Sequence, residues 1–547
     1  MQSPPESSSR ANFFPRPAEW IAAVIISLVV AGFHFDLLAH AGGFWRDEVN
    51  LINVASRPSL GQMSLDSFPV GMPLLVKSWT GLGLAQSDAN LRLLGIFIGL
   101  AAIASLWIAS FAVCRAPPLI SLTLFALNSN VIIFGDSVRS YGLGALLIVL
   151  TGAAACAVLK RPCWSRTALL AVIAVLSVQA LFHNAILVGA ICLGAMTVCA
   201  RRRNCLAAVR IAVAGIAAAV SLLPYLPHLF SGHDAMAVLR VGSSWTDVTT
   251  GLMVAVGSPV RPFACVWASL AVAVIAIAAA TGFQKSPNAG QSISNAEIRL
   301  FAGTTSLAAI AGLLGFLWLT GLPEEPWYFI SLMVLLATGF DAVFATLPDK
   351  MKNAILTGAA ITFLISLPID WHQMNFRFTN VDTLATDVTA EASPDDYVVI
   401  TPWFYGITFA HYYQGATPWT TVPPMADHST HRYDLLREQM LTTNAIQPIL
   451  GKITATLRNG HRVWFLYPAK VMANLREGVS KPQILPPPPL PRIGWSPDPY
   501  VAMWTSQVVF LLVNNGREIR IVDAKQSESS ITEDMDLLVI NGWRDTP

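Results

Sequence analysis

Two adjacent carboxylates, Asp47 and Glu48, stand in the segment Phe44-Trp45-Arg46-Asp47-Glu48-Val49, just after the first long apolar run of the chain. A carboxylate at a membrane surface can take a proton from a substrate hydroxyl, and partial desolvation at that depth would raise its basicity. The same residue types also suit the first turn of a solvated helix, where acidic side chains face the positive end of the helix dipole. Chemistry at this pair therefore depends on which other side chains lie beside it.

A second polar cluster, Asp136-Ser137-Val138-Arg139-Ser140-Tyr141, lies where two later apolar runs meet. The planar guanidinium of Arg139 can hold two oxygens of a phosphate at once, although an internal ion pair with Asp136 explains the arginine equally well. Asp136 and Tyr141 are further candidates for substrate contacts. We expect this cluster on the same side of the membrane as Asp47, which strengthens the functional interpretation of both.

Three more candidate substrate residues are His183, which follows another apolar run, and the adjacent Glu324 and Glu325. His183 is more often a structural histidine at the membrane interface, with its hydrogen bonds satisfied, than a ligand or base. The glutamates precede Trp327 and Tyr328, which fit the aromatic belt of a membrane protein. The belt accounts for the aromatic residues but not for the carboxylates.

The C-terminal third contains aromatic and histidine-containing groups. Trp403-Phe404-Tyr405 and His411-Tyr412-Tyr413 resemble a sugar-stacking surface, although such residues more often form a core. His428, His431 and Asp434 have a spacing that could suit a metal, but no fourth ligand is evident. The sequence therefore leaves the metal question open.

The elements that must position these residues are mostly transmembrane. Of the 547 residues, 54% are hydrophobic and only 12% charged, against about 25% charged in an ordinary soluble domain. A net charge of +2 gives no reason to expect nucleic acid as a partner. The composition excludes a soluble protein and predicts the lipid bilayer as the surroundings of most of the chain.

Apolar runs of membrane-spanning length recur about eleven times. The runs cover residues 18–38, 91–113, 118–134, 141–159, 167–182, 185–200, 206–228, 263–283, 298–321, 327–347 and 354–367. Basic joints such as Arg201–Arg202–Arg203 alternate with joints that are poor in basic residues, as the positive-inside rule requires. We therefore expect a multi-pass protein of the inner (plasma) membrane, with a cytoplasmic N-terminus and an extracytoplasmic C-terminal part.

Two domains are predicted. Residues 1–370 form the transmembrane domain, including an outer loop over 41–90, and residues 371–547 form an extracytoplasmic domain of ordinary size. In the latter, short β-rich runs at 397–401, 463–467, 508–513, 519–522 and 537–540 alternate with helix-like segments such as 433–442. This alternation predicts an α/β fold.

The order of these features resembles the GT-C superfamily of polytopic glycosyltransferases, which includes protein O-mannosyltransferases and the aminoarabinose transferases of lipid A. One span is followed by the Asp47-Glu48 pair, the segment Phe68-Pro69-Val70-Gly71-Met72-Pro73-Leu74-Leu75, then Leu91-Arg92-Leu93-Leu94, and then Arg139-Ser140-Tyr141. The proline segment is looser than the His/Pro-Pro-Leu-Tyr form common in the family. Good agreement in order covers about the first 200 residues.

The resemblance implies transfer of a sugar from a polyprenyl-phosphate carrier to an extracytoplasmic glycan, lipid or protein acceptor, with inversion. It implies that Asp47 is the general base, that Glu48 orients it or contacts the acceptor, and that Arg139 stabilises the departing phosphate. Some relatives bind a divalent metal and others do not, so no cofactor is assigned.

A transporter or flippase of lipid-linked material is the principal alternative function. Transporters usually place ionisable residues at mid-membrane, where the main candidates here are Arg210 and Asp341. The acidic pair Asp47-Glu48 lies instead at the expected outer surface, which favours an enzyme. A non-catalytic protein anchored by its spans would not need eleven of them.

Overall fold

The computed structural model describes residues 17–64, 68–227, 244–282, 293–321, 325–468, 482–488, 496–522 and 530–545. Within these ranges nine helices are long and apolar enough to cross a membrane, and α8 (Trp164–Ala180) is a shorter apolar helix. The nine are α1 (Pro17–His40), α5 (Asp88–Val113), α7 (Ser140–Lys160), α9 (Asn184–Arg202), α10 (Cys205–Val220) with η2 (Leu223–Tyr225), α14 (Phe263–Gly282), α15 (Asn295–Thr320), η3 (Pro326–Phe329) with α16 (Ile330–Phe344), and α17 (Asp349–Met374). The polytopic helical architecture is confirmed.

The predicted span over residues 118–134 is not one regular helix. It consists of a π-helical turn, η1 (Ser121–Ala126), followed by α6 (Ser129–Asp136). Asp341 of α16 accepts the backbone N–H groups of Ile120 and Ser121 at 2.7 and 3.1 Å, and the Asn128 side chain caps the start of α6. The prediction of a single helix was wrong because hydropathy reports the apolar character of a run, not the continuity of its backbone hydrogen bonds.

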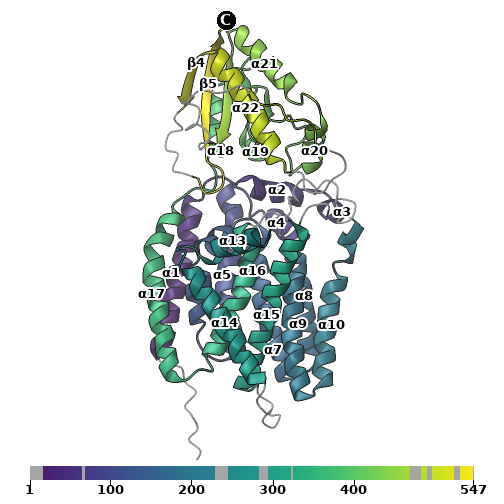
Figure 1. Ribbon diagram of the computed structural model, residues 1–547, viewed down its shortest axis with the longest axis vertical. Helices are drawn as coiled ribbons and strands as arrows, with labels where there is room; N and C mark the ends of the chain where they lie inside the picture. Colours follow the sequence, from purple (N-terminus) through teal and green to yellow (C-terminus); the bar gives the residue numbers. More distant parts are fainter. Residues whose placement is uncertain are drawn as a thin grey trace, which may run out of the picture.

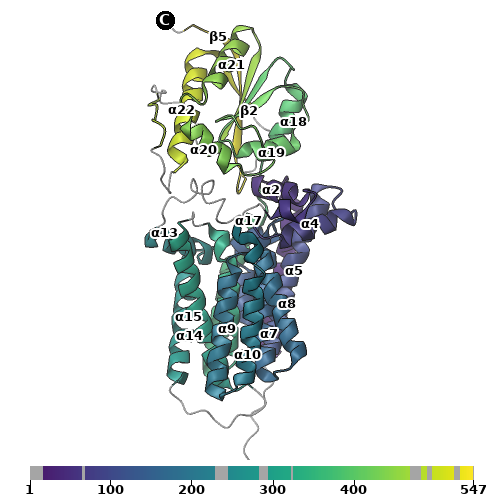
Figure 2. The same cartoon turned by 90° about the vertical axis from the view of Figure 1, so that its right-hand side faces the viewer.

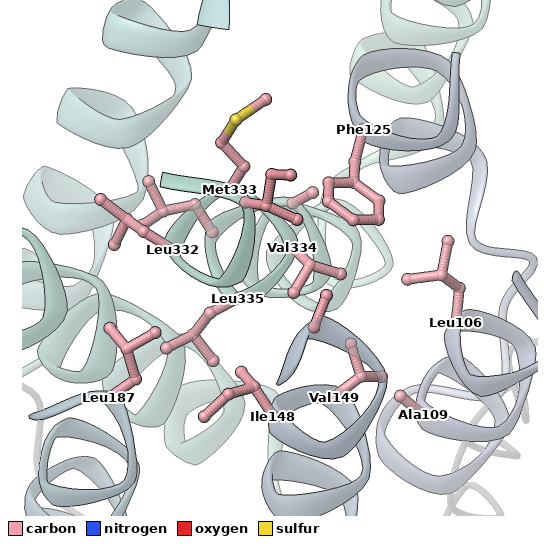
Figure 3. Close-up of a cluster of buried hydrophobic side chains, with 14 of the residues drawn as sticks. Leu106, Ala109, Phe125, Ile148, Val149, Leu187, Leu332, Met333, Val334 and Leu335 are labelled. Atoms are coloured by element: carbon pink, nitrogen blue, oxygen red, sulfur yellow. The ribbon is translucent and has the colours of Figure 1, made fainter. Parts of the chain in front are cut away.

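The core of the bundle lies around α16. Its residues Leu332, Met333, Val334 and Leu335 are all buried although they are consecutive in sequence, and Figure 3 shows side chains from several other helices around them. A helix that is apolar and buried on every side lies inside a bundle rather than at its edge. Asp341 is therefore an interior residue, and its role in capping η1 accounts for its carboxylate.

The described residues of the connection between α1 and α5 form three short helices. These are α2 (Arg46–Ala55), α3 (Leu60–Met63) and α4 (Gly71–Gly81). Figures 1 and 2 show α2 and α4 at one end of the bundle, beneath the C-terminal part of the chain. A further short helix, α13 (Trp245–Val256), precedes α14.

The C-terminal part is an α/β domain, here called the sheet domain. Among its described residues, five strands form one sheet in the order β2-β1-β3-β5-β4. They are β1 (Tyr397–Ile400), β2 (Trp419–Thr421), β3 (Arg462–Pro468), β4 (Gly516–Val522) and β5 (Met535–Trp543). The pairs β1–β2 and β1–β3 are parallel, whereas β5 is antiparallel to both β3 and β4. The expected α/β domain is confirmed as a mixed sheet.

Helices cover both faces of this sheet. Alternate residues of β1 point to opposite faces: Val398 packs with α18 (Val381–Glu391) and α19 (Tyr405–Tyr412), and Val399 with the other helices. Those helices are α20 (Tyr433–Leu441), α21 (Gln447–Arg458) and α22 (Asp498–Asn515). The predicted strand over residues 508–513 was wrong because this run lies in α22, where Trp504, Val508 and Leu512 recur at helical spacing on the buried side.

Candidate active site

Asp47 and Glu48 lie in the first turn of α2, at the end of the bundle that faces the sheet domain. The turn between α1 and α2 passes through Gly42, whose φ of 67° favours glycine. The two carboxylates point to different surroundings, and the structure gives them different partners.

Glu48 is fully buried in a network that joins three segments of the bundle. Arg92 of α5 donates from two nitrogens to the two Glu48 oxygens at 3.0 and 3.1 Å, and the backbone N–H of Val138 donates at 2.8 Å. Arg92 also donates to the carbonyl of Gly43 at 2.7 Å. Glu48 therefore holds α2 against α5 and against the link between α6 and α7.

Asp47 contacts two basic side chains from distant parts of the sequence. Its Oδ2 lies 3.2 Å from Arg139, which also donates to the Asp47 carbonyl at 2.9 Å, and its Oδ1 lies 3.0 Å from His431 Nε2. Burial acts to raise the pKa of Asp47, but Arg139 and His431 outweigh it and hold this pKa well below its ordinary value. Asp47 is therefore an ionised carboxylate between a guanidinium and an imidazole.

Arg139 is buried beneath Asp47, with its guanidinium 4.5 Å from the Phe68 ring centre and 5.7 Å from that of Tyr141. Asp136 does not take part in this group, because its Oδ2 lies 2.5 Å from Nδ1 of His34 in α1. The alternative ion pair between Arg139 and Asp136 is therefore replaced by the pair between Arg139 and Asp47.

An aromatic cluster lies next to Arg139. Tyr141 is 6.3 Å from both Trp327 and Tyr328, and His183 packs edge-on against Tyr328 at 6.4 Å between ring centres. Glu325 immediately precedes these residues at the start of η3, whereas Glu324 lies outside the described residues. The structure thus brings Tyr141 and His183 into one group with the predicted belt aromatics.

The sheet domain supplies His431 from the carboxyl ends of its parallel strands. Trp403 follows β1, and the segment that leads to His431 follows β2. The His431 ring stacks on Tyr433 at 5.7 Å with an interplanar angle of 9°, and it meets Trp403 edge-on at 6.2 Å. Loops at the carboxyl ends of parallel strands are the usual place for binding groups in α/β sheets, and here they face α2.

A second contact group fixes the sheet domain to α2. The backbone N–H of Arg46 donates to the Glu533 carboxylate at 2.9 Å. The guanidinium of Arg46 lies 3.5 Å from the same carboxylate and 4.7 Å from the Phe404 ring centre. Thr408 also donates to the buried Glu533, at 3.0 and 3.1 Å. Phe404 is therefore an interdomain contact, while Trp403 is a core residue of the sheet domain.

The two histidines and the aspartate whose spacing could have suited a metal do not converge. His428 packs against Trp419 at 4.5 Å, Asp434 pairs with Arg432 at 2.7 Å, and His431 lies on Asp47. In the described part of the chain, no group of three or more His, Cys, Asp or Glu side chains is arranged to hold a metal ion.

Two residues of this region were not predicted from the sequence: Arg92 as the partner of Glu48, and Glu533 as the anchor of Arg46. The contact between His431 and Asp47 was not predicted either. Arg92 stood in the segment Leu91-Arg92-Leu93-Leu94, and its position in an apolar run was a usable signal, because a buried arginine needs an anion. Nothing in the sequence pairs Glu533 or His431 with α2, since hundreds of residues separate them.

No protein-family model and no curated protein matches this sequence. Among solved structures, ArnT from Cupriavidus metallidurans is similar in its apo state, with a TM-score of 0.52 and 11% identity over 86% of this chain and 96% of that chain. ArnT bound to undecaprenyl phosphate gives a TM-score of 0.50 at 11% identity, over 85% and 96% of the two chains.

The oligosaccharyltransferase AglB from Archaeoglobus fulgidus, in complex with an inhibitory peptide and a dolichol-phosphate, is similar at a TM-score of 0.47 and 11% identity, covering 82% of this chain and 69% of that one. Because the match to ArnT covers 86% of this chain, it includes parts of both the bundle and the sheet domain. The chain therefore has the fold of ArnT, a membrane glycosyltransferase of the GT-C kind, as the sequence resemblance implied.

Proposed function

We propose that this protein is an integral-membrane glycosyltransferase that moves a sugar from a polyprenyl-phosphate carrier to an extracytoplasmic glycan, lipid or protein acceptor, with inversion. The observation that carries the proposal is the contact between Asp47 and Arg139 at the domain-facing end of the bundle. A carboxylate and a guanidinium are the two groups that such a transfer needs. The ArnT fold, solved with undecaprenyl phosphate in one structure, supports it.

We place this site on the extracytoplasmic side of the inner membrane. The basic residues Lys160 and Arg202 end α7 and α9, at the end of the bundle opposite to Asp47, and the positive-inside rule assigns that end to the cytoplasm. The N-terminus is then cytoplasmic. The domain boundary predicted after residue 370 falls within α17, which continues to Met374.

In the proposed reaction, Asp47 accepts the proton of the acceptor hydroxyl. The hydroxyl oxygen attacks the anomeric carbon of the donor sugar, and the bond between that carbon and the phosphate oxygen breaks on the opposite face. Arg139 neutralises the charge that develops on the departing phosphate. Glu48 positions Asp47 by holding the first turn of α2, since both of its own oxygens are already engaged.

Arg139 has two successive partners in this scheme. Its pairing with Asp47 keeps the pKa of the carboxyl low, although burial acts against that shift. A donor phosphate that binds Arg139 would draw the guanidinium from Asp47 and add negative charge nearby, so that the pKa of Asp47 rises. Asp47 therefore becomes an effective base when the donor is bound.

We further propose substrate contacts for Tyr141 and His183, which join the aromatic cluster beside Arg139. Glu324 and Glu325, which precede the aromatic residues of η3, complete the proposed set. Asp136 stays a prediction from the sequence alone, because its carboxylate pairs with His34 and not with Arg139.

The test is transfer of radiolabelled sugar from a panel of undecaprenyl-phosphate sugars in membranes that contain the wild type, D47N or R139A. D47N keeps the shape of the side chain and removes the base, so we expect a loss of about 100-fold or more. R139A should lose about 100-fold as well. The matched control is R458A, because Arg458 lies in an exposed ion pair of the sheet domain.

Full transfer by D47N would remove Asp47 from the role of base. A wild type that inserts correctly but transfers no sugar from any donor, and that moves lipid-linked sugar between leaflets, would favour the transporter function instead.

A further inference from the structure

His431 connects the sheet domain to the proposed base. Its Nε2 lies 3.0 Å from Asp47 Oδ1, and its backbone N–H donates to the side chain of Asn50, also in α2, at 3.0 Å. Because an ionised carboxylate only accepts hydrogen bonds, Nε2 must carry the hydrogen and donate to Asp47. One residue of the sheet domain is thus bound to α2 at two points one helical turn apart.

The imidazole is held in this orientation by its neighbours. The Tyr433 ring stacks on it nearly parallel and the Trp403 indole meets it edge-on, so that a rotation of the ring would lose both contacts. Two further basic groups lie near Asp47: Arg46, at 4.0 Å from Oδ1, and Arg139, at 3.2 Å from Oδ2. A donor fixed by packing holds its acceptor in one place.

The two oxygens of Asp47 therefore have separate partners. Oδ1 faces His431 and Oδ2 faces Arg139. In the proposed reaction the donor phosphate competes for Arg139, which frees Oδ2, whereas nothing in that step displaces His431 from Oδ1. The hydrogen bond from His431 thus determines which oxygen is left to meet the acceptor.

We propose that His431 is a positioning residue of the transfer reaction, which directs Oδ2 of Asp47 at the acceptor hydroxyl and makes the sheet domain a part of the active site. This inference rests on the proposed function. The acceptor proton moves to Oδ2, the acceptor oxygen bonds to the anomeric carbon, and the carbon–phosphate oxygen bond breaks with its electron pair on the phosphate. The proton on His431 Nε2 stays where it is.

Contacts that do not involve His431 also hold the sheet domain on the bundle. Tyr412 donates to Asp88 at 2.6 Å and accepts from the backbone N–H of Phe44 at 2.6 Å. Asn53 of α2 donates to the Ser429 carbonyl at 2.7 Å, two residues before His431. Asn53 therefore offers a matched control: it contacts the same segment of the sheet domain but does not touch Asp47.

The experiment compares full-length wild type, H431A, H431Q and N53A in nanodiscs, with the undecaprenyl-phosphate sugar panel as donors. The glutamine amide can donate from nearly the place of Nε2. We expect H431A to lower kcat by about 10- to 100-fold, because a misplacement of about 1 Å can cost about 100-fold. The donor KM should stay within about twofold, H431Q should recover most of kcat, and N53A should match the wild type.

Binding of undecaprenyl phosphate, measured separately, checks that H431A keeps a folded bundle. An H431A variant that binds this lipid and transfers sugar at the wild-type rate overturns the inference and leaves the proposed function intact. Equal losses in H431A, H431Q and N53A also overturn it, because they would indicate docking alone. If the wild type transfers nothing from any donor, the proposed function fails and the inference fails with it.

Discussion

Replacing Arg92 by alanine should destabilise the protein more than any exposed charge change, because it leaves Glu48 buried without a countercharge. Glu48 is 0% exposed and Arg92 3%. Removing one partner of a buried ion pair costs about 3–5 kcal/mol. The backbone N–H of Val138 would still donate to Glu48, so we expect a loss of about 3 kcal/mol, at the lower end of that range.

The assay is denaturant unfolding of the full-length protein in mixed micelles, followed by tryptophan fluorescence. The double variant E48Q/R92M removes both charges and keeps an acceptor for Val138, so it should recover more than half of the lost free energy of unfolding. R458A is the control for an exposed pair, since Arg458 and Asp545 are 58% and 82% exposed, and it should leave the midpoint unchanged.

Two results would refute this reasoning about Glu48. One is a loss of less than about 1 kcal/mol in R92A, which is the scale of a surface ion pair. The other is a double variant as unstable as R92A, since the cost would then come from lost packing rather than from a buried, unpaired charge.

Two further predictions concern Asp47 and a glycine of α5. Burial acts to raise the pKa of Asp47, but Arg139 and the imidazole beside it hold that pKa below its ordinary value. Its ionised form therefore adds stability above about pH 4, which is lost as the pH falls below that value. The Tm of the wild type should accordingly fall more steeply than that of D47N between about pH 5 and pH 3; parallel curves would contradict the shift. G99A should lower Tm, because a Cβ at Gly99 would collide with the Asp136 carboxylate. G358A in α17 is the control, because a Cβ at Gly358 would enter open space. Equal Tm values for these two variants would show that the collision is relieved without cost.

Most of the bundle could be predicted from the sequence, because membrane spans are local features. The apolar run of α5 can be identified from its own residues alone. In lipid no water can hydrogen-bond the backbone, so such a run must form a helix that satisfies its own backbone hydrogen bonds. The segment that contains η1 was misjudged for the opposite reason: its geometry depends on Asp341, which lies more than 200 residues away. The run over residues 508–513 was also misassigned, because its apolar residues are compatible with either a strand or a helix.

The site was predictable only in part. Asp47 and Arg139 could be placed on one side of the membrane by counting spans, and the structure brings them into contact. His431 could not be paired with Asp47, because its position results from packing the sheet domain onto α2 across 384 residues of sequence. The residue was visible as a polar group in the tail, but the sequence contained no signal for its partner.

The contact between Arg46 and Glu533 has a consequence for biosynthesis. The two residues are 487 positions apart, and the ribosome adds about 5–20 residues per second. Arg46 is therefore added to the chain about 25 to 100 s before Glu533. During this interval the bundle inserts into the membrane while the sheet domain does not yet cover α2. A chain that ends at a premature stop codon before residue 533 lacks the Glu533 carboxylate, which contacts Arg46 next to Asp47. Incomplete translation products would therefore lack this contact between the sheet domain and α2.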